Sequence, residues 1–319
     1  MADMVFSGVT FDGGFAITLP PPSYLAYAIF GFGYTNATGG TAITNLVSNT
    51  GVVAANTTGV GTGRNDLAAA GYGSDKAIFG YGYNVGAVSM TNLVSNTGVV
   101  GNDVTGVGTI RYGLAAATYG TDKAIFGYGS NYTGSAIYYS ITNLVSNTGV
   151  VGNDVTGVGT GRTSLAAAGY GSDKAIFGYG NDSGGATSYS ITNLVSNTGV
   201  VATNTTGVGT VRWGLAAAGY GTDKAIFGYG YNASSFQVSM TNLVSNTGVV
   251  ATDTTGVGTA RYSLAAATYD TTKAIFGYGQ ASGYESVTNL VSNTGVVATN
   301  TTGVGLARTA LAAASYGSI

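Results

Sequence analysis

The chain has 319 residues, of which 54 are glycine and only 8 % are charged, and its formal net charge is −2. It contains neither cysteine nor histidine, so we expect no disulfide, no thiolate nucleophile and none of the usual general bases or metal ligands. The near-zero charge argues against nucleic-acid binding, and no apolar run is long enough for a transmembrane helix. Hydrophobic residues make up 45 % of the chain, which is enough to bury a core.

The first 22 residues differ in composition from the rest. Residues 4–11 and 15–19 alternate loosely around Asp-Gly-Gly at 12–14, which is typical of a β-hairpin, and Pro-Pro-Pro at 20–22 predicts a stiff spacer. No basic segment precedes an apolar run here, so we expect no secretory signal. We expect residues 1–22 to be an arm that docks onto a partner protein or another subunit. The alternative is an extra strand along the outer edge of one sheet of the domain that follows.

From residue 23 onward, six copies of one sequence follow each other at a mean period of about 49 residues. Each copy contains four short segments with the composition of strands, and turn signals separate them. In the copy that begins at Leu67, these segments span residues 67–72, 76–82, 91–95 and 98–101. Four-stranded units at this period are typical of the blades of a β-propeller.

The strand order at the two ends of the repeats favours a closed ring. The repeats begin with a second strand, at Ala28, and finish with a first strand, at Leu311. One blade would therefore be completed from both ends, which limits exposed sheet edges. We predict that residues 23–319 form an all-β domain, a six-bladed β-propeller closed by pairing of the N- and C-terminal segments; a β-solenoid is the alternative.

The second strand of each copy carries the large aromatic residues. Phe79 and Tyr81 are two positions apart, so we expect them to share one face of the strand, with Ile78 and Gly80 on the other. The aromatic side chains of one blade would then pack on the small residues of the next. An aromatic stripe can also bind sugars, but we expect core packing.

The order of these motifs resembles that of kelch repeats. Arg261 precedes an apolar first strand, the second strand from Lys273 ends in Gly-Tyr-Gly, and a third strand follows from Val287. The resemblance covers residues 24–319 and implies a propeller. Gly-Tyr-Gly replaces the kelch glycine doublet and valine replaces the tryptophan of the fourth strand, so the adaptor and copper-oxidase roles of kelch proteins are not carried over. The nearly identical Gly/Thr/Asn-rich copies are also similar to repeat proteins of tailed bacteriophages.

The copies differ mainly in two places. The loops between second and third strands have 10, 8, 12, 11, 10 and 8 residues, and the residue after each repeated arginine also varies. Up-and-down strand order places both sets at one end of the blades; we call this end the variable face and the opposite end the turn face. Tyrosine, serine, glycine and asparagine are typical of binding loops, although unconstrained loops also diverge. The candidate ligand-binding residues are Tyr83, Asn84, Tyr112, Asn131, Tyr132, Tyr138, Asn181, Asp182, Tyr189, Trp213, Tyr231, Asn232, Phe236, Gln237, Tyr262, Tyr284 and Glu285.

The basic residues occupy fixed places in the repeat. Six arginines precede the first strands and five lysines begin second strands, which accounts for all 11 basic residues. The arginines can form a ring that binds anions, or they can hydrogen-bond loop carbonyls and nearby Asn or Asp side chains. We favour the structural role, because every copy keeps its arginine whatever its loop. The possible anion ring consists of Arg64, Arg111, Arg162, Arg212, Arg261 and Arg308.

No residue pattern indicates catalysis. No carboxylate pair is placed for acid–base chemistry, the Gly-x-Gly motifs precede no helix, and the Asn-Asp-Ser at 181–183 has too few ligands for calcium. We therefore expect no enzyme activity, no cofactor and no metal site.

The phage resemblance implies a virion protein, assembled in the host cytoplasm, whose variable face binds the host surface. Residues 1–22 would contact other virion proteins or further subunits, and a host glycan is the expected ligand. A self-assembling structural protein and a multivalent lectin of cellular origin, in the cytoplasm or at the cell surface, are the alternatives.

Overall fold

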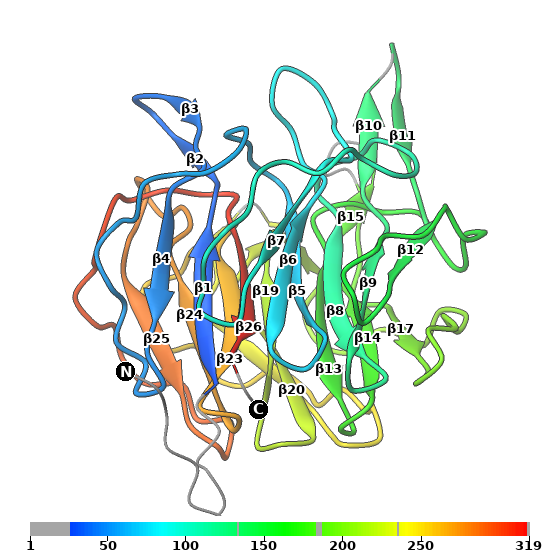
Figure 1. The fold of residues 1–319 in the computed structure, drawn as a ribbon. Helices are drawn as coiled ribbons and strands as arrows, with labels where there is room; N and C mark the ends of the chain where they lie inside the picture. The colour runs from blue at the N-terminus through cyan, green and yellow to red at the C-terminus, as the bar shows by residue number, and fades with distance from the viewer. Residues whose placement is uncertain (1–25, 133, 183–186, 235, 318–319) are drawn as a thin grey trace, which may run out of the picture.

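A computed structural model describes residues 26–132, 134–182, 187–234 and 236–317, so the expected arm at residues 1–22 lies outside the described residues. The described part of the chain is all β and contains no helix, and therefore none that is long and apolar enough to cross a membrane. Its main elements are six three-stranded antiparallel sheets, which we number I to VI in the chain order of their second strands (Figure 1).

Each sheet contains the first, second and third predicted strand of one repeat. The first strands of sheets I to VI are β26 (Ala312–Tyr316), β5 (Ala68–Tyr72), β8 (Ala115–Tyr119), β13 (Ala166–Tyr170), β19 (Ala216–Tyr220) and β23 (Ala265–Tyr269). The second strands are β1 (Tyr27–Gly31), β6 (Lys76–Gly80), β9 (Lys123–Gly127), β14 (Lys174–Gly178), β20 (Lys224–Gly228) and β24 (Lys273–Gly277). The third strands are β4 (Thr44–Val47), β7 (Thr91–Val94), β12 (Thr142–Val145), β17 (Thr192–Val195), β22 (Thr241–Val244) and β25 (Thr288–Val291).

The fourth predicted strand does not form a regular ladder. In sheet I it pairs with β4 through only two isolated bridges, Val47 with Val53 and Thr44 with Thr57. Between these bridges, the buried side chain of Asn45 donates from Nδ2 to the carbonyl oxygen of Ala54, at 3.0 Å. A side-chain amide thus takes the place of a ladder hydrogen bond, and the expectation of four regular strands per unit was wrong in this respect. The same bridges recur in the other five sheets.

Sheet I joins the two ends of the described chain. Its second strand β1 pairs with β26 over five residues, from Tyr27 opposite Tyr316 to Gly31 opposite Ala312. Each first strand contacts the first strands of two other sheets, in the order I, II, III, IV, V, VI and back to I. The pairing that we predicted between N- and C-terminal segments is therefore present.

Backbone hydrogen bonds between sheets run through all six sheets at both ends of the first strands. At one end, the amide of Gly113 donates to the carbonyl of Asp66, at 2.8 Å, and equivalent bonds link every pair of adjacent sheets. At the other end, the amide of Gly73 donates to Asp122, at 2.7 Å, and this series also passes through sheet I, where Ala26 and Gly317 take part. Adjacent sheets are therefore fastened to each other by the main chain at both ends.

Packing between sheets depends on one aromatic residue and one glycine per repeat. A Cβ atom added to Gly80 of β6 would lie 2.6 Å from Cζ of Phe126 in sheet III, and the same relation recurs between all neighbouring sheets. The expectation that Phe79 and Tyr81 share a face was wrong. Phe79 packs toward sheet I, whereas Tyr81 packs toward sheet III against Phe126. Tyr81 lies just beyond β6 with a φ of 62°, and this left-handed conformation breaks the alternation of the strand.

Candidate functional site

The two variable sets of the repeat lie together at one end of the sheets. In every sheet, the residue after the arginine forms an antiparallel bridge with the first residue of the loop between second and third strands; examples are Asn65 with Tyr83 and Tyr262 with Gln280. Figure 1 shows the hairpins β2–β3 (Tyr34–Thr35 and Gly39–Gly40) and β10–β11 (Ser130–Tyr132 and Ala136–Tyr138) projecting from this end. These bridges confirm the prediction that the two variable sets lie at the same end of the sheets.

Most loops of this face have local structure of their own. Loop residues form the pairs β2–β3, β10–β11 and β15–β16 (Asn181–Asp182 and Thr187–Ser188), while β18 (Arg212–Trp213) pairs with β21 (Tyr231–Asn232). In the loop of sheet V, the Oδ1 atom of Asn232 accepts hydrogen bonds from the amides of Ser234 and Phe236, each at 3.0 Å. The face is therefore built from short hairpins and turns on a regular sheet framework.

Aromatic candidates gather between sheets V and VI. The ring centroids of Trp213 and Tyr231 are 5.1 Å apart, and those of Trp213 and Tyr262 are 5.5 Å apart. Tyr231 and Tyr262 also contact each other, at 5.1 Å. All three side chains are half-buried. Desolvation, followed by the charges of Tyr231 and Tyr284, raises the pKa of Tyr262. Tyr262 and Tyr284 both form backbone bridges with Gln280, so Tyr284 belongs to the same loop region as this trio.

Two other aromatic pairs lie on the same face. Tyr34 meets Tyr284 edge-on, with centroids 6.2 Å apart, which extends the sheet V–VI group toward sheet I. Tyr83 meets Tyr112 at 5.4 Å between sheets II and III. Tyr34 was not among the candidate residues, although it occupies the same loop position as Tyr83 and Tyr231, and that equivalence was the signal that could have found it.

The remaining candidates differ widely in exposure. Tyr132 and Phe236 are exposed at 67 % and 65 %, whereas Asn131 and Asn181 are exposed at only 7 % and 6 %. The two asparagines are therefore poorly placed to meet a ligand from solution. Oδ1 of Asn131 accepts a hydrogen bond from the backbone amide of the next residue, Tyr132, at 2.7 Å.

Polar side chains on the outer loops mainly hold the loops. The hydroxyl of Tyr189 donates to Oδ2 of Asp182, at 2.6 Å, and Nε2 of Gln237 donates to the carbonyl of Ala281, at 3.4 Å. The second bond ties the loops of sheets V and VI together. Asn84 is exposed, while Tyr138 and Glu285 are half-buried.

The six arginines lie between sheets rather than on the variable face. Each side chain is fully buried, and each guanidinium lies 4.3–4.4 Å from the centroid of an aromatic ring of the preceding sheet. Arg64 donates from Nε to the carbonyl of Tyr81 at 2.8 Å, from Nη1 to Thr62 at 3.1 Å and from Nη2 to Oδ1 of Asn92 at 2.7 Å. In all six sheets, Nη1 of the arginine donates to the backbone carbonyl of the residue two positions before it in the chain. The structural role accounts for these contacts, and none of the guanidinium groups is accessible for an anion in this structure.

Among the described residues, only three of these arginines lie within 4 Å of a carboxylate oxygen. Arg64, Arg111 and Arg212 lie 3.7–3.9 Å from Asp103, Asp154 and Asp253 respectively. The equivalent positions beside the other three arginines are asparagines, namely Asn204, Asn300 and Asn56. Desolvation lowers the pKa of Arg64 to about 10 despite the opposing charge of Asp103. Burial of these cations is therefore offset mainly by hydrogen bonds and ring contacts.

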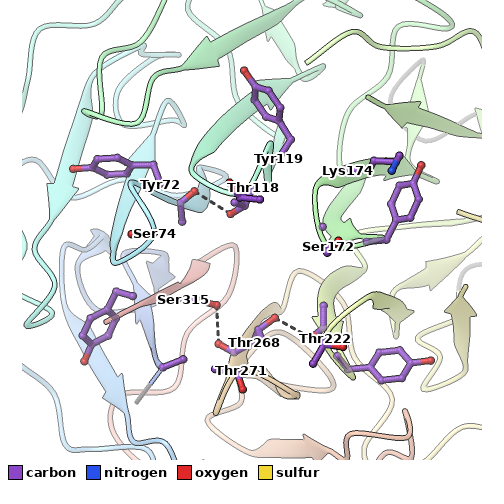
Figure 2. Close-up of a pocket in the computed structure, with 18 of the residues that line it drawn as sticks. Tyr72, Ser74, Thr118, Tyr119, Ser172, Lys174, Thr222, Thr268, Thr271 and Ser315 are labelled. Atoms are coloured by element: carbon purple, nitrogen blue, oxygen red, sulfur yellow. Dashed lines mark hydrogen bonds between the residues drawn. The ribbon is translucent and has the colours of Figure 1, made fainter. Parts of the chain in front are cut away.

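The turn face contains a hollow of about 470 Å³ that is lined by residues of all six sheets (Figure 2). Figure 2 shows Tyr72 and Tyr119 pointing away from its centre, which is surrounded by small side chains. Three of the hydroxyls that line it donate to carbonyls of neighbouring sheets: Thr118 to Gly71 at 2.9 Å, Thr268 to Gly219 at 2.8 Å and Ser315 to Thr268 at 2.7 Å. These three hydroxyls fasten first strands of neighbouring sheets to each other.

A smaller hollow of about 100 Å³ at the variable face is also lined by residues of all six sheets. Its rim carries Asp66, Ser164 and Ser263 on alternate sheets, with Gly113, Gly214 and Ala310 between them. Asp66 has a φ of 51° and retains some exposed surface. Desolvation in the narrow mouth nevertheless raises the pKa of its carboxyl to about 6.

No protein-family model matches the chain, and no curated protein is significantly similar to it. Within the described residues, no three or more carboxylates lie together as a group that could hold a metal ion. The geometry instead presents aromatic rings, amides and hydroxyls on a rigid support. Such a surface can bind a ligand by stacking and hydrogen bonding.

Proposed function

We propose that this chain is a non-enzymatic recognition protein of a virion, in a tail, fibre or surface decoration, whose variable face binds the host surface. The observation that carries the proposal is the gathering of both variable sets of the repeat on one face of an otherwise uniform framework. A rigid scaffold that varies only in its loops is the arrangement of many binding proteins. The assignment to a virion rests on the resemblance to phage repeat proteins.

We further propose that the six sheets are the blades of a closed β-propeller. The pairing of β1 with β26, the cyclic order of contacts between first strands and the two series of inter-sheet hydrogen bonds all support this architecture. A ring of this kind holds six loops in fixed relative positions, which favours recognition of an extended surface.

A binding experiment with a loop-replaced variant tests the function. The purified chain would be applied to an array of bacterial surface polysaccharides, beside a variant whose six variable loops are all replaced by the eight-residue loop 83–90. We expect the native chain to bind and the variant to lose binding while keeping its circular dichroism spectrum. Equal binding by both proteins, or binding by neither, would contradict the proposal.

A structural protein that assembles with further copies is the second candidate. One observation favours it: each sheet exposes a valine next to the turn between third and fourth strands, 65–66 % exposed in every case. These valines are Val52, Val99, Val150, Val200, Val249 and Val296. Ordered assemblies in sedimentation or electron microscopy, without any bound ligand, would favour this candidate.

A further inference from the structure

Solvent-accessible positive charge is confined to the turn face. All 11 basic residues of the chain lie in the described part: six are the fully buried arginines, and five are lysines. Each lysine begins a second strand at the turn face and pairs with an aspartate of the same turn, at 2.6–3.0 Å. Within the described residues, the variable face therefore presents no exposed lysine or arginine to a ligand.

The ionisable groups that do belong to the variable loops and connections are acids and tyrosines. The acids of the loops and of the residues next to the arginines are Asp66, Asp182 and Glu285, and the connections between fourth and first strands also carry Asp103, Asp154 and Asp253. A sulfated, phosphorylated or carboxylated ligand would meet like charges and no accessible partner cation on this face. Like charges disfavour association, and the effect is strongest at low salt. Charge thus selects against acidic ligands.

The aromatic groups of this face are distributed unevenly. We define the aromatic patch as Trp213, Tyr231, Tyr262, Tyr284 and Tyr34. Ring contacts join the first three residues to each other and Tyr284 to Tyr34, and backbone bridges of Gln280 to both Tyr262 and Tyr284 connect the two groups across sheets V, VI and I. Sheet IV carries Thr163 and Asn181 at the equivalent positions and has no such ring there. The six sheets are therefore not six equal sites, and the aromatic patch lies on one side of the face, over sheets V, VI and I.

The chemistry of the aromatic patch matches that of a sugar ring. The C–H groups of a pyranose carry partial positive charge and pack on the negative face of an aromatic ring, while its hydroxyls need donors and acceptors at the edge of the contact. Phenol hydroxyls of the patch and the carboxyl of Glu285 supply such groups. The hydrogen bond from Gln237 to Ala281 holds the two loops that carry much of the patch, which reduces the entropy lost on binding.

We propose that the aromatic patch is a single binding site for an uncharged saccharide chain of the target surface, and that the face discriminates against acidic glycans. The inference rests on the proposed function and specifies its ligand class and its site. It differs from a multivalent lectin with one pocket per blade, because the five aromatic residues occupy only three of six sheets.

The chain contains a built-in probe of this site, because Trp213 is its only tryptophan. Titration of the intact protein with dextran and mannan, and separately with dextran sulfate and alginate, would be followed by tryptophan emission and by calorimetry. We expect at least one uncharged polysaccharide to shift the emission and to bind with a stoichiometry of one chain segment per protein. The affinity should change less than about twofold between about 50 and 500 mM salt. The two acidic polymers should give no binding.

Matched variants separate the site from the face as a whole. Trp213→Ala and Tyr284→Ala are each expected to weaken binding about tenfold or more, with Trp213→Phe restoring most of it. Tyr139→Ala, which removes a half-buried ring from the loop of sheet III outside the aromatic patch, is the control and should change affinity less than about twofold. Circular dichroism checks folding, and Tyr284→Ala, in an outer loop, remains informative if Trp213→Ala does not fold.

The outcomes distinguish the inference from the proposed function. Salt-sensitive binding of dextran sulfate or alginate, or binding of an uncharged glycan that survives both patch variants, would overturn the inference and leave a recognition face elsewhere in place. Absence of binding to all four polymers, together with absence of binding to the bacterial array, would overturn both.

Discussion

The substitution Gly80→Ala tests the packing between sheets directly. A methyl group at this position would lie 2.6 Å from Cζ of Phe126 and 3.0 and 3.2 Å from its two Cε atoms. Phe126 is fully buried and also contacts Tyr81, with ring centroids 5.1 Å apart. The ring has little room to move away, because protein interiors are close-packed. Overpacking of this kind costs about 1–3 kcal/mol, so we expect the free energy of unfolding to fall by that amount.

Equilibrium unfolding in guanidinium chloride measures the effect. Gly86→Ala is the matched control, because no atom lies within 4 Å of its added methyl group, and its effect should stay within about 0.5 kcal/mol. Combining Gly80→Ala with Phe126→Leu should recover part of the loss, with a coupling of about 1 kcal/mol in a double-mutant cycle. A Gly80→Ala protein as stable as the Gly86→Ala control, or strictly additive effects in the cycle, would refute this account of inter-sheet packing.

Three further expectations concern the buried arginines, the carboxyl of Asp66 and strand β26. Arg111→Met should lower the free energy of unfolding by about 3–5 kcal/mol, and by more than Arg162→Met, because only Arg111 also loses an ion pair, the one with Asp154; equal losses in urea unfolding would argue against an electrostatic contribution. Asp66→Asn should stabilise the protein more at pH 7.5 than at pH 4.5, since a folded pKa of about 6 means that the wild type loses stability as pH rises from about 4 through 6; a pH-independent difference would contradict this. Removal of residues 312–319 deletes β26 and should abolish cooperative thermal unfolding by circular dichroism, and an unchanged transition would contradict the importance of the β1–β26 pairing.

The strand positions could be predicted from the sequence because the repeat supplies six independent copies of one pattern. The segments from Leu67 and Lys76 contain β5 and β6, and the segment from Thr91 contains β7. The errors arose where a single residue departs from regular geometry. A left-handed φ at Tyr81 reverses the direction of its side chain, and the amide of Asn45 interrupts the fourth strand. Neither event changes the composition or the period of the segment.

The variable face could be placed from strand order alone, but its internal arrangement could not. Alignment of the copies shows which positions vary, yet it does not show that Trp213 and Tyr231 contact Tyr262 of the next sheet. It also gives no sign that Asn131 and Asn181 are buried by the pairing of their loops. These features depend on how adjacent loops lean together, which is a tertiary property.

The pairing of β1 with β26 has a consequence for how the chain finds its fold. All six first strands have almost the same sequence, Leu-Ala-Ala-Ala followed by a small residue and tyrosine, so side-chain chemistry hardly distinguishes β26 from β5 or β8 as the partner of β1. The correct partner is selected by elimination. Each of the other five second strands pairs with the first strand that immediately precedes it in the chain, so β26 is the only first strand that remains for β1. When two chains fold together, β26 of each chain can instead pair with β1 of the other. Refolding at low protein concentration should therefore yield monomers, and refolding at high protein concentration should yield strand-exchanged dimers.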